Sequence, residues 1–355
     1  MEMKGTVALP GMVDAHVHLR GLLLSYKEDP ASGTRAALRG GVVAVADMPN
    51  TLPKANNVEN LKLKLKELKE KCLVDCYAYG GVPESPEEAR LMAKYVVGFK
   101  VYPEDYSKLH VLRGYEGLIV VHPEHPDFVK ESPEPGERAF SRSPQAEPEA
   151  MELFRNFKRV HFTHVSTPEG AEKAKSMGFT YDVTPHHLLL NNEVERRKKC
   201  KAKVNPLLRD DPRRSLLFEK FLREDVPVVT DHAPHALWEK ELPFSECPPG
   251  FPGLETALSL LITLYKRGVI SLEKVVKSYS ELPAKLLGLW PDLGRLESGA
   301  LASFTVVDLD SRWKVEPWEF ESKAKYSPFE GMDLWGEVVA TVVRGKMRYF
   351  AGRFY

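Results

Sequence analysis

The 355-residue sequence contains no long hydrophobic run, few cysteines and no excess of charge of either sign. A membrane-spanning helix needs about 18 consecutive apolar residues, and no segment approaches that length. The first residues, MEMKG, lack the charged head and apolar stretch of a signal peptide. These absences argue against an integral membrane protein and against a secretory leader. We therefore expect a soluble, cytoplasmic protein.

The balance of charge bears on the possible binding partners, and the cysteine content bears on the redox state of the chain. Lys and Arg total 50, and Asp and Glu also total 50, so we expect no broad basic face for nucleic acid and no polybasic patch for anionic lipid. The four cysteines form no CxxC pair and are too few to cross-link a chain of this length. We therefore expect Cys72, Cys76, Cys200 and Cys247 to be reduced thiols.

The sequence is rich in short apolar runs that alternate with segments of helical spacing. This alternation is typical of a parallel sheet built from βα units, and runs dense in Val, Ile, Phe or Tyr are typical of strands buried on both faces. The predicted strands are 12–16, 42–47, 73–79, 97–102, 118–122, 160–164, 180–184 and 226–231. The predicted helices between them are 32–39, 58–71, 86–95, 147–157, 168–176 and 211–224.

Eight such units favour an α/β fold of the (β/α)8 TIM-barrel type, with a doubly wound open sheet as the alternative. After Gly253 the pattern changes to two amphipathic helices, 254–266 and 272–287, followed by short β-rich pieces. We predict a barrel over residues 11–289 and a small β subdomain formed by residues 1–10 and 290–355. The Pro/Glu-rich segment 132–148 is predicted to be a long exposed loop.

Residue types that ligate metals stand at the carboxyl ends of five predicted strands, which is where barrel enzymes place their active sites. His16 and His18 are two positions apart on the first strand, so their side chains point to the same side and can hold one cation together. The other strand ends carry Lys100, His122, His164 and Asp231.

Each of these residues also has an ordinary structural interpretation. A lone strand histidine is often a hydrogen-bonded core residue, HxH is a short and common pattern, and Asp231 could cap the next helix. Lys100 is costly inside an apolar strand unless it is paired with a carboxylate or neutral. A neutral lysine amine can instead capture carbon dioxide as a carbamate, whose oxygens suit two cations. The coincidence of all these residues at one end of the predicted barrel favours a metal site.

The motifs resemble those of the dihydroorotase family, within the amidohydrolase superfamily of metal-dependent (β/α)8 barrels. HVHLR at 16–20, MPNT at 48–51 and DHAPH at 231–235 form a specific combination, and the similarity runs through nearly the whole chain. GFKVY at 98–102 and KYSPFEG at 325–331 are most similar to the lysine-containing dihydroorotases, including the domain of the animal multifunctional pyrimidine protein.

The resemblance implies a site for two divalent cations, expected to be Zn²⁺. The implied ligands are His16, His18 and Asp231 for the more buried cation, His122 and His164 for the more exposed one, and Lys100, carboxylated on Nζ, as the bridge. A hydroxide bridging the cations would attack the substrate carbonyl, with Asp231 as general acid and base. The implied reaction is the reversible interconversion of (S)-dihydroorotate and N-carbamoyl-L-aspartate in de novo pyrimidine biosynthesis.

Specificity is expected to rest on side chains outside the ligand set. By resemblance, the substrate contacts are Arg20, Asn50 and His235 on the carboxylate, Asn205 on the ring, and main-chain groups of Pro252 and Gly253. The planar guanidinium of Arg20 matches a carboxylate bidentately, although a surface salt bridge is its ordinary alternative. Hydantoinases and allantoinases, which open related rings, are the nearest rival functions.

The resemblance also bears on partners. It is compatible with a homodimer and with association with aspartate transcarbamoylase. A non-catalytic scaffold that organises such a partner is an alternative from another functional class. Loss of ligand residues would mark such a scaffold, and all of the ligand residues are present here.

Overall fold

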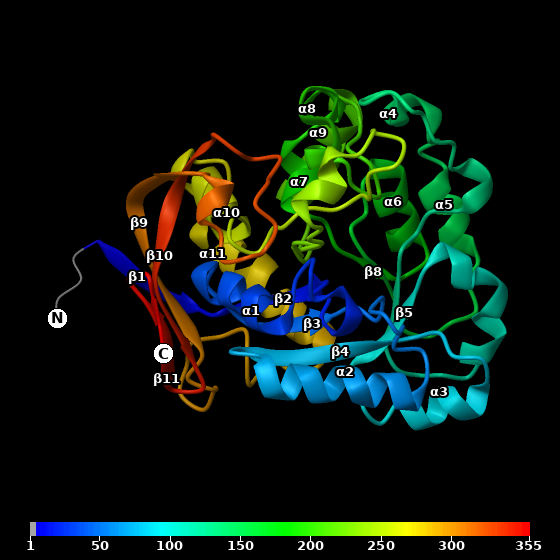
Figure 1. Cartoon of the computed structure of the whole chain (residues 1–355), viewed down its shortest axis with the longest axis horizontal. Coiled ribbons are helices and arrows are strands. Elements are labelled where there is room, and N and C mark those ends of the chain that lie inside the picture. The colour runs from blue at the N-terminus through cyan, green and yellow to red at the C-terminus, as the bar shows by residue number, and fades with distance from the viewer. Residues whose placement is uncertain (1–4) are drawn as a thin grey trace.

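The computed structural model describes residues 5–355, and their strands form two separate sheets (Figure 1). A seven-stranded parallel sheet lies in the middle of the molecule, and a five-stranded antiparallel sheet lies at the side where the C-terminal segment is found. Residues 1–4 of the predicted β subdomain lie outside the described residues. Within residues 5–355, no helix has both the length and the apolar composition that a membrane span requires.

The parallel sheet runs in chain order from its first strand to its last, as expected for consecutive βα units. Its strands are β2 (Met12–Val17), β3 (Val42–Asp47), β4 (Asp75–Gly81), β5 (Gly98–Val101), β6 (Ile119–Val121), β7 (Val160–Phe162) and β8 (Thr180–Tyr181). Every residue of β2, β3, β5, β6 and β7 is buried, which explains why the sequence shows continuous apolar runs there. Seven predicted strands are therefore confirmed, with ends that differ by a few residues.

The eighth predicted strand, 226–231, is not a regular strand. Val228 in this segment makes an isolated parallel bridge to Val183, and His232, directly after it, makes one to Val17. The segment therefore lies between the end of β8 and the end of β2 without a hydrogen-bonded ladder to either. The structure shows a curled seven-stranded sheet with an irregular closing segment in place of the eight regular strands predicted.

The backbone donors of this segment explain the irregularity. Pro227 has no N–H, and the N–H of Val228 donates to the carbonyl of Ser278 at 2.8 Å. The N–H of Thr230 donates to the carboxylate of Asp14 at 3.2 Å. These interactions use donors that a ladder would need, and no apolar pattern in the sequence reveals them.

Helices follow most strands and cover the parallel sheet. The longer ones are α1 (Pro30–Arg39), α2 (Val58–Lys71), α3 (Pro86–Met92), α5 (Ala146–Glu152), α6 (Pro168–Ser176), α9 (Asp211–Arg223) and α10 (Ala257–Lys266). The sequence signals are clear for α2, whose bounds match the predicted 58–71. Its N-cap Asn57 accepts a hydrogen bond from the N–H of Asn60 at 2.8 Å, while Leu61 and Leu68 lie buried on one face.

Further helical segments complete the connections. They are η1 (Leu22–Leu24), η2 (Pro103–Leu112), η3 (Pro126–Phe128), α4 (Arg138–Ser141), α7 (Pro185–Leu189), α8 (Asn192–Lys198), η4 (Lys199–Ala202), η5 (Leu237–Glu241), α11 (Leu272–Val276), α12 (Leu282–Leu287) and η7 (Pro317–Glu319). The predicted helix 272–287 is continuous along the chain, but its middle is a π-helical turn, η6 (Lys277–Glu281).

The antiparallel sheet has the order β1-β9-β10-β11-β12. Its strands are β1 (Thr6–Pro10), β9 (Phe304–Lys314), β10 (Asp333–Val343), β11 (Lys346–Phe350) and β12 (Arg353–Phe354). The N-terminal strand pairs with β9, as predicted, and the predicted turn at Gly345 has a positive φ of 76°. Gly336 of β10 also has a positive φ, and a Cβ there would lie 2.6 Å from Ile262 of α10. The sheet and α10 can therefore pack closely.

The segment 132–148 is not the exposed loop that was predicted. It contains α4 and the start of α5, and Arg138, Arg142 and Glu147 within it are almost completely buried. Its Pro and Glu content suggested solvent exposure. The fold instead buries these charged side chains against residues far away in the sequence.

The cysteine prediction is also corrected, because all four cysteines are paired. Cys72 bonds to Cys76, and Cys200 bonds to Cys247 across a sequence separation of 47. Pairing requires Cα atoms about 4.4 to 6.8 Å apart. The fold brings the Cα atoms of Cys200 and Cys247 to 6.0 Å, a proximity that neither count nor spacing indicates.

Candidate metal centre

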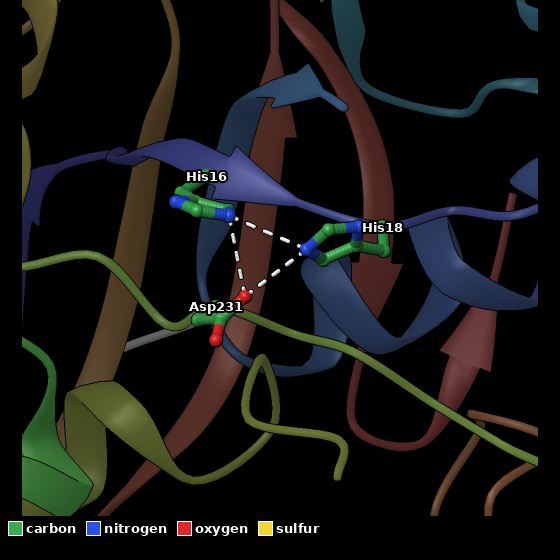
Figure 2. Close-up of side chains that lie close together, drawn as sticks. All are labelled: His16, His18 and Asp231. Atoms are coloured by element: carbon green, nitrogen blue, oxygen red, sulfur yellow. Dashed lines mark hydrogen bonds and ion pairs between the residues drawn. The ribbon is translucent and has the colours of Figure 1, made fainter. Parts of the chain in front are cut away.

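The core of the site is a group of two histidines and one aspartate (Figure 2). His16 lies in β2 and His18 directly after it, and their Nε2 atoms are 3.3 Å apart. Oδ1 of Asp231 lies 3.2 Å from Nε2 of His16 and 3.1 Å from Nε2 of His18. All three side chains are buried. The structure therefore unites three of the predicted ligands around one point.

Backbone contacts hold Asp231 in this position. The N–H of His18 donates to the carbonyl of His232 at 2.8 Å, which joins the closing segment to the end of β2. Asp231 has a positive φ of 49°, a conformation that Asp tolerates better than most residues. The absence of a regular eighth strand thus coincides with the placement of Asp231 beside the two histidines.

His122 and His164 come from the ends of β6 and β7 and extend the group. The imidazole centroids of His122 and His164 are 4.6 Å apart, and those of His16 and His164 are 5.0 Å apart. Four imidazoles from the ends of β2, β6 and β7 therefore form a continuous cluster, although β2 is separated from β6 by three strands in the sheet. Burial, together with the charge of His122 and of Lys100, holds the pKa of His164 well below its ordinary value. A neutral imidazole is the form that binds metal.

Asp182, directly after β8, holds the backbone and side chains next to this cluster. It was not identified from the sequence. Its carboxylate accepts hydrogen bonds from the N–H of His164 at 2.5 Å and from Oγ1 of Thr163 at 3.1 Å. Thr163 in turn lies 2.6 Å from Nδ1 of His16. A lone Asp after a two-residue strand gives little sequence signal, although its place at a strand end matches the other site residues.

Lys100, in β5, is completely buried, and its Nζ has no hydrogen-bond partner within residues 5–355. Burial lowers the pKa of Lys100 to about 7. The ring centroid of Tyr102 lies 5.1 Å from Nζ. The salt-bridge interpretation of Lys100 is not supported, because no carboxylate of the described chain forms an ion pair with it.

The residues present fit a metal site. His16, His18 and Asp231 offer ligand atoms within 4.8 Å of one another, the spacing of a shared cation. Lys100 Nζ and His164 Nδ1 are buried polar atoms without a partner in the described residues, and such atoms need an explanation. Burial, followed by the charge of Lys100, holds the pKa of His16 well below its ordinary value, so His16 is neutral.

A cavity of about 680 Å³ opens above this cluster. Its lining includes the five imidazole and carboxylate residues named above as ligands and four of the predicted substrate contacts, namely His16, His18, His122, His164, Asp231, Arg20, Asn50, Asn205 and His235. Pro252 and Gly253 do not belong to the lining, which passes Pro249 and Gly250 instead. The N–H of Gly253 donates to Nδ1 of His232 at 3.1 Å and so shapes the wall indirectly.

Arg20 and His235 form one wall of the cavity. Nη2 of Arg20 lies 3.2 Å from Nε2 of His235, and Nε of Arg20 donates to the carbonyl of Pro234 at 3.1 Å. Burial and the charges of Arg20 and Lys27 hold the pKa of His235 well below its ordinary value. A neutral imidazole beside a fixed guanidinium suits an anionic ligand group.

The two asparagines contact other site residues in this structure. Oδ1 of Asn50 lies 2.7 Å from Nδ1 of His18, a contact that orients the imidazole with Nε2 toward Asp231. Oδ1 of Asn205 accepts hydrogen bonds from Arg142 at 3.1 Å and from Arg138. Arg142 was overlooked because its segment resembles an exposed loop.

Comparisons with known proteins agree with this geometry. The Amidohydrolase family model matches residues 149–348, and the Dihydro-orotase-like model matches residues 5–99. A curated dihydroorotase of Aeropyrum pernix is 40% identical over 365 residues, covering 98% of this chain and 84% of that protein. One from Saccharolobus solfataricus is 35% identical over 358 residues, covering 99% and 86%. The chain belongs to the dihydroorotase family.

Solved structures show the same architecture. L-hydantoinase (dihydropyrimidinase) from Arthrobacter aurescens has a TM-score of 0.92 at 28% identity, covering 99% of this chain and 87% of that chain. Dihydropyrimidinase from Brevibacillus agri NCHU1002, at 22% identity and a TM-score of 0.88, shares the fold. As a dihydroorotase-family member of the amidohydrolases, this chain is a metal-dependent hydrolase.

Proposed function

We propose that this chain interconverts (S)-dihydroorotate and N-carbamoyl-L-aspartate, as a step of pyrimidine biosynthesis. The observation that carries the proposal is a single cavity that joins the group of His16, His18 and Asp231 to the guanidinium of Arg20. The hydrolytic centre suits a cyclic amide, and the guanidinium suits the carboxylate that dihydroorotate carries beside its ring. The curated relatives named dihydroorotase support the same substrate.

The side chains that would hold two divalent cations, with Zn²⁺ as the expected metal, follow from the cluster. His16, His18 and Asp231 would hold one cation, and His122 and His164 would hold the other. When bound, the cations would polarise the amide carbonyl and lower the pKa of the attacking water from about 15.7 toward 7. The fold is proposed to be a closed barrel around this centre. The isolated β-bridges that join the closing segment to the ends of β2 and β8 support this arrangement.

Lys100 is proposed to be carboxylated on Nζ and to bridge the two cations. A neutral amine can form an N–C bond with carbon dioxide and lose a proton, and the lowered pKa of Lys100, about 7, favours the neutral amine. The buried Nζ has no partner in the described chain, so a carbamate would supply what this position lacks.

Asp231 is proposed as general base and acid. During hydrolysis its carboxylate takes the proton of the attacking water as the new C–O bond forms. It then gives that proton to the ring nitrogen as the C–N bond breaks, and the product is the open ureido acid. The position of Oδ1 beside both His16 and His18 supports this role, because the proton must be held at the reacting carbonyl.

The remaining cavity residues are proposed to bind the substrate. Arg20 and His235 would hold its carboxylate, Asn205 would contact the ring, and Asn50 would orient His18 as well as face the carboxylate. Main-chain groups near Pro252 and Gly253 are proposed to complete the pocket. Their neighbours Pro249 and Gly250 line the cavity directly, which supports this wall as a binding surface.

Parallel assays of the purified chain on dihydroorotate, hydantoin and allantoin test the proposal, with metal analysis of the same chelator-free sample. We expect turnover of dihydroorotate in both directions and two equivalents of divalent metal. Hydantoin is the rival substrate because of the similarity to L-hydantoinase. Preferential turnover of hydantoin or allantoin would replace the proposal.

Location and assembly are proposed from the family resemblance. We propose a cytoplasmic enzyme that forms a homodimer and associates with aspartate transcarbamoylase. Sedimentation of the chain alone, and then mixed with aspartate transcarbamoylase, tests both associations.

A further inference from the structure

His122 contacts a buried ion pair that is formed by Glu124 and Arg142. Oε2 of Glu124 lies 2.7 Å from Nε2 of His122, and both Glu124 oxygens accept hydrogen bonds from Nη1 of Arg142, at 3.0 and 3.1 Å. Glu124 and Arg142 have only 3% and 2% of their surface exposed. A buried ion pair at the edge of a catalytic cavity costs desolvation energy, so a function for it should be sought.

The same guanidinium also reaches the substrate side of the cavity. Nη1 of Arg142 donates to Oδ1 of Asn205 at 3.1 Å, and Nη2 pairs with Glu131. The carbonyl of Arg142 accepts a hydrogen bond from Arg209 at 2.8 Å, which fixes the backbone at this point. Arg142 therefore connects Glu124, which contacts the imidazole of His122, with Asn205, which is proposed to contact the substrate ring.

Both oxygens of Glu124 accept hydrogen bonds from Nη1 of Arg142, so Glu124 is paired with a guanidinium in the geometry of a carboxylate. A carboxylate can only accept hydrogen bonds, so Nε2 of His122 is the donor of the contact with Glu124. Nδ1 is then the ring nitrogen of His122 that is left to take a ligand.

We propose that Glu124 and Arg142 are positioning residues that couple the metal-facing His122 to the substrate-facing Asn205. Glu124 fixes the tautomer and ring orientation of His122, so that Nδ1 is the atom presented to a cation. The guanidinium of Arg142 donates to both Glu124 and Asn205, so a single side chain fixes the His122 side and the Asn205 side of the cavity. The inference rests on the proposed role of His122 as a metal ligand.

The first test measures metal binding without turnover. Zn²⁺ affinity is determined by competition with a chromophoric chelator for the wild type, Glu124→Gln and Glu124→Ala. We expect Glu124→Ala to weaken the second equivalent of Zn²⁺ by about 10- to 100-fold and to leave the first unchanged. Glu124→Gln keeps an acceptor oxygen and should retain part of this affinity. Unchanged affinity for both equivalents in Glu124→Ala would overturn the positioning role.

The second test separates Arg142 from its neighbour Arg138. Arg138 also donates to Asn205, but its ion pairs are with Glu195 at 3.0 Å and with Glu131 at 3.1 Å, and within residues 5–355 it forms none with Glu124. Arg142→Met should weaken the second Zn²⁺ and raise KM for dihydroorotate together, whereas Arg138→Met should raise KM alone. In the double variant of Glu124→Ala with Arg142→Met, the losses of Zn²⁺ affinity should not add. Additive losses, or an Arg142→Met variant with wild-type Zn²⁺ affinity, would contradict the coupling.

Two controls keep the outcomes distinct. Glu131→Gln removes the exposed carboxylate that pairs with both Arg142 and Arg138, and it should leave Zn²⁺ affinity within about twofold of the wild type. If Arg142→Met fails to fold, Arg142→Lys is measured instead. Lys keeps the positive charge but lacks the planar guanidinium that can donate to Glu124 and Asn205 together, so this variant should also lose the second Zn²⁺. The wild type is measured first, because a wild type without two Zn²⁺ equivalents or without dihydroorotate turnover would refute the proposed function and not the positioning of His122.

Discussion

Oδ1 of Asp231 lies 3.1 Å from Nε2 of His18, although the two residues are 213 positions apart in the chain. The contact joins the two ends of the curled parallel sheet, because His18 follows β2 and Asp231 lies in the closing segment after β8. The site is therefore assembled only when the sheet has curled fully. This dependence links the integrity of the fold to the chemistry of the centre.

Asp231→Asn should abolish most of the activity while preserving the fold. Asn is nearly isosteric with Asp and tolerates the positive φ of 49° at this position, but it cannot accept and return a proton. We expect kcat to fall by about 10²- to 10⁴-fold. Asp225→Asn, at an exposed surface residue of the same connection, is the matched control and should retain activity. Retention of more than a tenth of wild-type kcat in Asp231→Asn would argue against the proton role.

If Lys100 bridges two cations as proposed, Lys100→Met should lose one of them and the activity with it. Met keeps the apolar stem in the buried position but offers no amine for carbon dioxide. Metal analysis by plasma mass spectrometry should show a loss of about one equivalent, and the wild type incubated with ¹³C-bicarbonate should give a carbamate signal in NMR. Two tightly bound metals in Lys100→Met, or no carbamate in the active wild type, would remove the bridge from the proposal.

Much of this centre could be predicted from the sequence, because its signal lies in local patterns. The HxH pair, the buried lysine and the histidines after apolar runs stand at strand ends, and the carboxyl ends of parallel strands converge. His16, His18 and Asp231 meet as expected. The regular strands were found for the same reason, since burial on both faces leaves a continuous apolar run.

The features that escaped the sequence depend on distant partners. The irregular closing segment follows from Pro227 and from a hydrogen bond between Thr230 and Asp14, which are far apart in the chain. The burial of Arg142 depends on Glu124, and the Cys200–Cys247 bond depends on the packing of η4 against the segment that follows η5. A charged or Pro-rich segment looks exposed in a sequence unless its buried partners are known.

Arg20→Met should impair recognition of the substrate carboxylate more than the chemical step. A hydrogen bond to a charged group contributes about 1.5 to 3 kcal/mol, so KM for dihydroorotate should rise about 10- to 100-fold. The preference for dihydroorotate over dihydrouracil, which lacks the carboxylate, should largely disappear. Arg159→Met, at an exposed residue before β7, is the control. An unchanged preference in Arg20→Met would assign carboxylate binding to another residue.

The two disulfides should contribute unequally to stability. In the chain-entropy model, the stabilisation grows with the length of the closed loop, and separations of 47 and 4 residues correspond to about 4 and 2 kcal/mol. The Cys200→Ser and Cys247→Ser double variant should therefore lower the midpoint of thermal unfolding more than the Cys72→Ser and Cys76→Ser double variant. Calorimetry with and without a reducing agent measures both. Equal effects would indicate that loop closure is not the source of the stabilisation.

Glu255 should make the stability of the fold depend on pH. Its carboxyl group is buried and accepts hydrogen bonds from the N–H groups of Glu321 and Ser322, each at 3.1 Å, with Arg39 at 3.4 Å. Burial raises the pKa of Glu255 from its ordinary value of 4.5 to about 7, because these partners only partly offset the desolvation of the charge. The folded protein therefore holds a proton on Glu255 that the unfolded chain releases.

The sign of the effect follows from this pKa difference. A group whose pKa is raised on folding stabilises the fold fully below its unfolded pKa, here 4.5, and loses that contribution as the pH rises through its folded pKa, here about 7. The contribution at stake is roughly 3 kcal/mol as an upper value, at about 1.4 kcal/mol per pKa unit. Glu255→Gln cannot titrate, so the free energy of unfolding of the wild type should fall relative to this variant between about pH 5 and pH 8. Urea unfolding across this range tests the prediction, with exposed Glu273→Gln as the control, and a constant difference between wild type and Glu255→Gln would show that Glu255 is charged in the fold throughout.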